Sequence, residues 1–174
     1  LQTTEAQGFE GEQIHLDNSA DSLDVLRHST AHLMAQAVKA LYPDAKLYVG
    51  PNVKEGFYYD FKTESEIGSG DLKRIEKQML SFAKKKVEIE KYEISMEEAR
   101  EKFKDDHLKQ AVLDKIPSDT VSIYKQGEFE DLCRGPHLPN VGLVRYFKLL
   151  KIAGAYLGGD SKNEMLTRIY GIAF

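Results

Sequence analysis

Residues 22–43 read SLDVLRHSTAHLMAQAVKALYP, and this stretch decides the fold. Its apolar side chains recur at the three- and four-residue spacing of an amphipathic helix, and they are Leu23, Leu26, Leu33, Met34, Ala37, Val38 and Leu41. His28 and His32 are four residues apart, so on a helix they share a face that differs from the apolar one. The stretch therefore predicts a long helix, ending before Pro43, that buries one side and presents two imidazoles from another.

The composition describes a globular domain. The chain has 174 residues, of which 30% are charged and 41% hydrophobic, and its formal net charge is −4. It contains no apolar run as long as a membrane span and no signal-peptide pattern. The single Cys133 cannot form an internal disulfide, which favours a reducing compartment, so we expect a cytoplasmic protein without a membrane partner. Because the chain does not begin with Met, we expect it to be a piece of something longer.

Strand patterns occur after the predicted helix and again near the end of the sequence. After the helix, residues 46–49 and 56–61 predict the two strands of a hairpin, with a Gly-Pro-Asn turn between them. Residues 145–153 are apolar and basic, and residues 154–160 are glycine-rich and turn-like. Residues 165–174 alternate as a half-buried strand does. These strands predict an antiparallel sheet for the long helix to pack on.

The middle of the chain, from about 65 to 128, has a different character. A second helical pattern begins at Ser69, residues 87–94 alternate as a strand, and the Ser95-to-Glu98 capping box starts a third helix. Residues 107–116 fit a short helix or an irregular lobe.

We therefore expect an α+β fold, in which a long helix packs on an antiparallel sheet and a smaller αβα subdomain is inserted. The subdomain would span about 65–128 within a domain formed by residues 21–174. Residues 1–20 are polar and contain two glycines, and we interpret them as a leader or linker.

A second chemical cluster lies far from the histidine pair, in Asp131-Leu132-Cys133-Arg134-Gly135-Pro136-His137. Glycine and proline fix an irregular backbone here, which suits the wall of a site. Three imidazoles and one thiol can make a tetrahedral zinc site, and the residues are His28, His32, Cys133 and His137. Each pair alone is a weak signal. His15 and His107 lie in polar surroundings and receive no role.

Several blocks resemble, in order, the editing domain of bacterial threonyl-tRNA synthetase. They are HSTAH (28–32), GFYYD (56–60), DLCRGPH (131–137), FKLLK (147–151), GAYLGGD (154–160) and RIYG (168–171). The histidine and cysteine pattern alone is shared with alanyl-tRNA synthetase editing domains and free-standing deacylases, whereas CRGPH and RIYG favour the threonyl family. In that family a catalytic core and an anticodon-binding domain follow this domain. We therefore expect no adenylate-forming site here, a ubiquitin-like N-terminal domain missing or reduced to the first 20 residues, and a monomer.

The resemblance implies hydrolysis of serine mischarged onto threonine tRNA, with threonyl-tRNA excluded. One methylene-sized contact is worth only ~1–3 kcal/mol, so a synthetic site needs a second sieve to reject serine. The implied partners are the acceptor end of threonine tRNA and the missing domains of the same chain. The rival interpretation is a zinc-binding or non-catalytic module that binds the tRNA acceptor.

The resemblance also assigns roles to residues. Four side chains line the pocket and orient or deprotonate water, namely His28, His32, Cys133 and His137. Asp131 is expected to hold the substrate's amino group or hydroxyl, and Tyr59 to shape the pocket. Lys109 is expected to hold the attacking water or to balance developing negative charge.

Two further expectations concern cofactors and tRNA. Alanyl-type relatives use the four pocket positions as zinc ligands, whereas the threonyl resemblance implies a metal-free site that needs no cofactor. Zinc and a covalent acyl-enzyme on Cys133, with Arg134 lowering the thiol pKa, remain the alternatives. Lys148, Lys151 and Arg168 lie in the basic C-terminal stretch and are expected to contact tRNA phosphates near the acceptor end.

Overall fold

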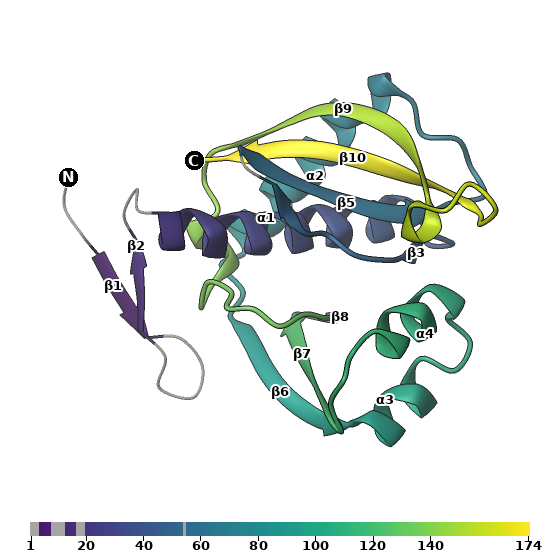
Figure 1. Cartoon of the computed structure of the whole chain (residues 1–174). Helices are drawn as coiled ribbons and strands as arrows, with labels where there is room; N and C mark the ends of the chain where they lie inside the picture. The colour runs from purple at the N-terminus through teal and green to yellow at the C-terminus, as the bar shows by residue number, and fades with distance from the viewer. Residues whose placement is uncertain (1–3, 8–12, 17–19, 54) are drawn as a thin grey trace.

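A computed structural model describes residues 4–7, 13–16, 20–53 and 55–174 (Figure 1). Its α-helices are α1 (Ala20–Leu41), α2 (Leu72–Lys84), α3 (Met96–Lys102) and α4 (His107–Asp114). Its strands are β1 (Thr4–Gln7), β2 (Gln13–Leu16), β3 (Lys46–Leu47), β4 (Asn52–Val53), β5 (Gly56–Lys62), β6 (Ile89–Ser95), β7 (Thr120–Gln126), β8 (Phe129–Leu132), β9 (Phe147–Tyr156) and β10 (Met165–Ala173). In the described part of the chain no helix is both long and apolar enough to cross a membrane.

The main sheet is antiparallel and has the strand order β3-β5-β10-β9, with β4 also paired to β5. β10 is the alternating strand predicted at the end of the chain, and Ile169 pairs with Tyr59 on one side and Ile152 on the other. A second sheet has the order β6-β7-β8, and β1 pairs with β2. Helices together with antiparallel sheets confirm the predicted α+β class.

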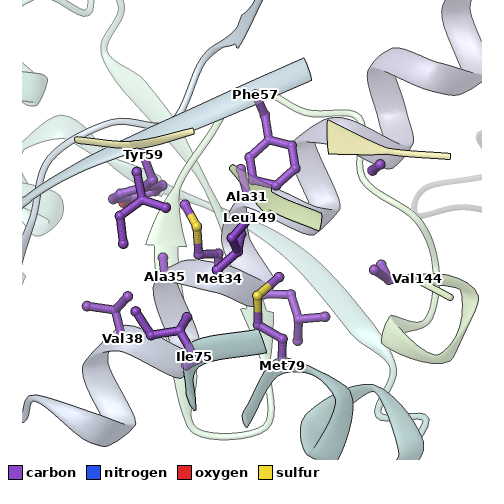
Figure 2. Close-up of a cluster of buried hydrophobic side chains, with 14 of the residues drawn as sticks. Ala31, Met34, Ala35, Val38, Phe57, Tyr59, Ile75, Met79, Val144 and Leu149 are labelled. Carbon is purple, nitrogen blue, oxygen red and sulfur yellow. The ribbon is translucent and has the colours of Figure 1, made fainter. Parts of the chain in front are cut away.

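α1 is the predicted long helix, and it packs on the main sheet as expected. Figure 2 shows Ala31, Met34 and Val38 of α1 beside Phe57 and Tyr59 of β5. β5 alternates, because its odd-numbered aromatic residues face this core while the next residues face outward. α2 adds Ile75 and Met79 to the same core, and each is fully buried.

The smaller lobe has a core of its own. Its buried side chains come from α3, α4, β7 and β8, and they are Ala99, Leu113, Val121, Ile123 and Leu132. Figure 1 shows this lobe below α1, on the side away from β9 and β10. The α2 helix, which lies within the predicted insertion, packs with the main core instead, so the packing of the smaller lobe begins at β6. The division into domains at about 65–128 stays a prediction.

Two local expectations need correction. The hairpin does not turn at Gly-Pro-Asn, because Asn52 pairs with Phe57 and Val53 with Gly56. The glycine-rich turn begins later than residue 154, because β9 continues as far as β10 can pair with it, to Tyr156 opposite Met165. In residues 1–20, β1 pairs with β2, and residues 1–3, 8–12 and 17–19 lie outside the described residues, so the leader or linker stays a prediction.

Candidate active site

The two chemical clusters of the sequence meet in space. His28 and His32 project from α1, and Cys133 and His137 lie in the loop after β8. The ring centroids of His32 and His137 are 4.4 Å apart, and those of His28 and His137 are 6.1 Å apart. The Nε2 atom of His137 lies 3.1 Å from the Cys133 Sγ. The structure therefore brings together all four side chains of the predicted set.

The surroundings of α1 differ from the expectation that only one side of the helix is buried. Residues 29–35 are all buried, and His32 is only 4% exposed. The reason is that the main sheet covers one side of α1, while β8 and the loop after it cover the side that carries the histidines. Ser29 of α1 holds the loop after β8 against the helix, because its Oγ accepts a hydrogen bond from the Leu138 backbone N–H at 2.8 Å. His28 stays partly exposed at the edge of this contact.

A buried polar network lies beside the imidazoles. The Asp131 carboxylate accepts hydrogen bonds from the Lys109 ammonium, from the Tyr59 hydroxyl at 2.5 Å and from the Leu132 N–H at 2.8 Å. Lys109 also donates to the Tyr48 carbonyl at 3.1 Å and to the Tyr59 hydroxyl at 3.4 Å. The His32 Nε2 atom is 3.5 Å from the second Asp131 oxygen. Asp131, Lys109 and Tyr59 thus form one unit in which the buried charge is paired.

Burial keeps the imidazoles of this site neutral. Desolvation, followed by the nearby positive charge of Lys109, lowers the pKa of His32 to about 3. Desolvation also lowers the pKa of His137 well below its ordinary value, with His32 as a further cause. The pKa of His28 is lowered as well, by burial, although Asp24 opposes the change. At neutral pH the three imidazoles therefore carry no charge that would repel a cationic amino group, and His28, whose burial is the least complete, keeps the most basic character.

The thiol of Cys133 is protonated at neutral pH. Burial raises its pKa to about 11, and the hydrogen bond from the Gly135 N–H opposes this only in part. Arg134 was expected to lower the pKa of the thiol. The backbone N–H of Arg134 does lower this pKa, but its side chain is exposed, and desolvation outweighs the effect, so the pKa of the thiol is raised.

Three of the four predicted zinc ligands are close enough to share a metal ion. The ligand atoms of His32, Cys133 and His137 lie within 4.8 Å of one another, whereas His28 is not in this group. Three protein ligands with an open position suit a catalytic zinc site better than a structural one. A bound ion would act as a Lewis acid. The expectation that no cofactor is needed stays a prediction.

The residues expected to bind tRNA are partly engaged within the domain. Arg168 donates two hydrogen bonds to Asp60, at 2.7 and 2.8 Å, and its guanidinium lies 3.9 Å from the centre of the Tyr58 ring. Lys151 lies over the Tyr170 ring, 4.8 Å from its centre. The Nζ atom of Lys148 is 3.8 Å from Glu76. Lys148 and Lys151 are exposed, so they can reach a phosphate more readily than Arg168 can.

Tyr124 is a site neighbour that sequence reasoning missed. Its ring stacks on His137 with the centroids 4.1 Å apart and the planes inclined by 27°. Tyr124 lies in an alternating strand, where an aromatic residue is expected in any core. No local pattern distinguishes it, and only the pairing of β7 with β8 shows where its ring points.

Comparisons with known proteins identify the class of domain. Residues 121–170 match the family described as the threonyl and alanyl tRNA synthetase second additional domain. The chain is 70% identical over its whole length to a threonine--tRNA ligase of Nautilia profundicola, of which it covers 29%. It is 66% identical to that of a Sulfurovum species and 64% identical to that of Campylobacter jejuni, over 92% and 93% of the chain and 27% of each relative.

The fold, the meeting of the two clusters and these matches define a second additional domain of the synthetase type. The chain matches threonine--tRNA ligases along its length, and these matches support its assignment as the editing domain of a threonyl-tRNA synthetase. It spans less than a third of the length of the curated relatives that it matches.

Proposed function

We propose that the chain hydrolyses the ester bond of serine mischarged onto threonine tRNA and spares threonyl-tRNA. The observation that carries this proposal is the meeting of His28 and His32 with the Cys133–His137 loop, beside the buried Asp131–Lys109 pair. The match to the threonyl and alanyl tRNA synthetase second additional domain supports the same conclusion. The tRNA is the expected partner, and the acceptor end carries the ester.

The reaction is attack of water on the ester carbonyl. The water oxygen bonds to the carbonyl carbon, the bond from that carbon to the ribose oxygen breaks, and the ribose oxygen takes a proton. A neutral imidazole is needed to accept the proton of the water. His28 suits this role, because it is neutral at pH 7 and it is partly exposed, so that water and a tRNA end can reach it. His32 has a pKa of about 3, which makes it a weak base, so we assign it to orienting the water.

The Asp131 unit supplies fixed charge. Lys109 balances the negative charge that develops on the carbonyl oxygen, since its ammonium is held by Asp131 and by the Tyr48 carbonyl. Asp131 accepts hydrogen bonds from Lys109, Tyr59 and the Leu132 N–H. We place the substrate amino group at the carboxylate oxygen that faces His32, where it would add a further hydrogen bond. Tyr59 closes the wall of the pocket behind this carboxylate.

A protonated thiol supports a water-mediated reaction over an acyl-enzyme. The nucleophile in cysteine catalysis is the thiolate, and a pKa of about 11 leaves almost none at pH 7. Cys133 is therefore assigned to the pocket wall, where its sulfur contacts His137. We assign the rejection of threonine to steric exclusion of its additional methyl group by the pocket wall.

The experiment compares hydrolysis of threonine tRNA charged with serine and the same tRNA charged with threonine. Rapid loss of serine and survival of threonine are expected. His28→Ala and Cys133→Ala should keep the fold and abolish hydrolysis. His107→Ala is the matched control, because this exposed imidazole pairs with Glu164 outside the site. Wild-type rates in both site variants would overturn the assignment.

A metal-dependent site is the second candidate function, and the spacing of His32, Cys133 and His137 favours it. Zinc content and stability separate the two candidates. If the purified chain holds one zinc ion per molecule, loss of hydrolysis on chelation with the fold retained indicates a catalytic zinc site, and unfolding on chelation indicates the structural zinc module. If chelation leaves both the fold and the hydrolysis unchanged, the metal-free site stands.

A further inference from the structure

Within the described part of the chain, the Nδ1 atom of His137 makes none of the hydrogen bonds that normally set the orientation of a functional imidazole. The ring nitrogen that faces away from the chemistry usually bonds to a carbonyl or carboxylate. The Nδ1 atom of His137 is buried and finds no hydrogen-bond partner among the described residues. Its Nε2 atom contacts Cys133, itself part of the same loop. Because the one hydrogen bond of the ring goes to a neighbour in the same loop, packing from outside the loop must contribute to its orientation.

Tyr124 supplies that packing. Its side chain is 1% exposed, and its ring lies almost parallel to the His137 ring at 4.1 Å. Tyr124 pairs directly with Asp131 across the β7–β8 ladder, so the two side chains stand on the same face of the small sheet. The strand pair thus holds the buried carboxylate and the surface on which the imidazole rests in one rigid piece.

The loop between Cys133 and His137 is shaped to fit this tyrosine. Gly135 has a φ of +73°, which favours glycine, and a Cβ atom built on it would lie 1.8 Å from the Tyr124 hydroxyl oxygen. The loop backbone therefore lies against the outer end of the ring, while His137 stacks on its face. Beyond the loop, the buried Ser29 hydroxyl accepts a hydrogen bond from the Leu138 N–H. Ser29 lies between His28 and His32 in the sequence, and Leu138 follows His137. This hydrogen bond therefore connects the histidine-bearing turn of α1 to the loop that carries His137.

We propose that Tyr124 is a positioning residue for His137, and that Ser29 fixes the same loop to α1. The proposal rests on the proposed hydrolysis for its kinetic consequence, although the position of the ring can be measured without any activity. Tyr124 sets the imidazole plane through its ring, and its hydroxyl contributes by filling the space that a side chain at residue 135 would need.

The first test is spectroscopic and uses the whole chain with isotope-labelled histidine. A ring stacked at this distance shields the imidazole protons of His137, so their NMR signals should lie upfield of those of exposed His107. Tyr124→Phe keeps the ring and should keep the shift, whereas Tyr124→Leu should remove it. If the His137 signals stay unchanged in Tyr124→Leu, the proposal is overturned, whether or not the chain proves to be a hydrolase.

The second test is kinetic. Tyr124→Leu should lower kcat for the seryl ester by roughly 10- to 100-fold with little change in KM, since a misplacement of about 1 Å costs a catalytic group that much. Tyr124→Phe should restore kcat to within about twofold of the wild type. Tyr92→Leu is the matched control, because Tyr92 is a tyrosine of the same small sheet that packs in the core of the lobe and bonds to Glu130. A loss of kcat in this control equal to that in Tyr124→Leu would reduce Tyr124 to a structural residue.

Ser29→Ala provides a second, smaller change if Tyr124→Leu fails to fold. The variant removes one hydroxyl and leaves the Leu138 N–H without its acceptor. It should shift the NMR signals of His137 and lower kcat while α1 stays helical. Unchanged signals and unchanged kcat in this variant would contradict the role of Ser29 in fixing the loop.

Discussion

The Lys109 ammonium donates a hydrogen bond to the Asp131 carboxylate in the interior of the domain, where the two residues are 3% and 1% exposed. Lys109 comes from α4 and Asp131 from β8, so the pair joins two elements of the smaller lobe. Its further bond to the Tyr48 carbonyl, next to β3, extends this joint to the main sheet. The pair thus links the smaller lobe to the main sheet, and the site lies where these two parts meet.

Removing one partner of this pair should be costly. Lys109→Met leaves a buried carboxylate without its cation, and we expect a loss of roughly 3–5 kcal/mol in the free energy of unfolding, measured with urea. Lys104→Met is the control, because its pair with Glu101 is exposed, and it should cost less than about 1 kcal/mol. Equal losses in the two variants would contradict the structural role of the buried pair. Adding Asp131→Leu to Lys109→Met should recover part of the stability.

Acid should destabilise the domain through its buried histidines. His32 has a pKa of about 3 when folded and an ordinary pKa near 6.5 when unfolded, so only the unfolded chain takes up a proton between these values. The stability present above pH 6.5 is lost as the pH falls, by about 2 kcal/mol at pH 5 for this residue alone. Unfolding curves between pH 7 and pH 5 measure the loss. His32→Gln should lessen the slope of stability with pH.

The Cys133 thiol should react as a buried, protonated group. Because its pKa is raised to about 11, the rate of alkylation by iodoacetamide should still increase about tenfold per pH unit between pH 8 and pH 10. In the urea-unfolded chain the same rate should level off near pH 9, at the ordinary pKa of cysteine. A native profile that levels off near pH 8 would revive the acyl-enzyme alternative.

Charge reversal should distinguish the two exposed lysines from Arg168, which is held by Asp60. If Lys148 and Lys151 contact tRNA phosphates, replacing both by Glu should weaken binding and reduce the dependence of log Kd on log salt by about two phosphate contacts. Arg168→Gln should instead lower stability, because it breaks the paired hydrogen bonds to Asp60. A double replacement of exposed Lys104 and Lys162 is the control for net charge. An unchanged salt dependence in the Lys148 and Lys151 variant would remove these residues from the tRNA interface.

Much of the fold could be predicted because it depends on local patterns. The α1 helix follows from its apolar spacing and from Pro43, β10 follows from its alternation, and α3 begins at the predicted Ser95 cap, whose Oγ accepts from the Glu98 N–H at 3.0 Å. The predicted ends of strands were less accurate than the predicted helix, because a strand ends where its partner strand stops pairing with it. β9 runs past its glycine because β10 continues to pair with it.

The sequence by itself determined which chemical groups the protein has and which of them share a face, because side-chain direction follows from the helical and strand repeats. His28 and His32 were therefore predictable as a pair. Only the tertiary structure decided that His32 is buried, that the Cys133 thiol stays protonated, that Lys109 pairs with Asp131 and that Tyr124 lies against His137. These properties depend on desolvation and on contacts between residues far apart in the chain, and both exist only after the smaller lobe has packed against α1.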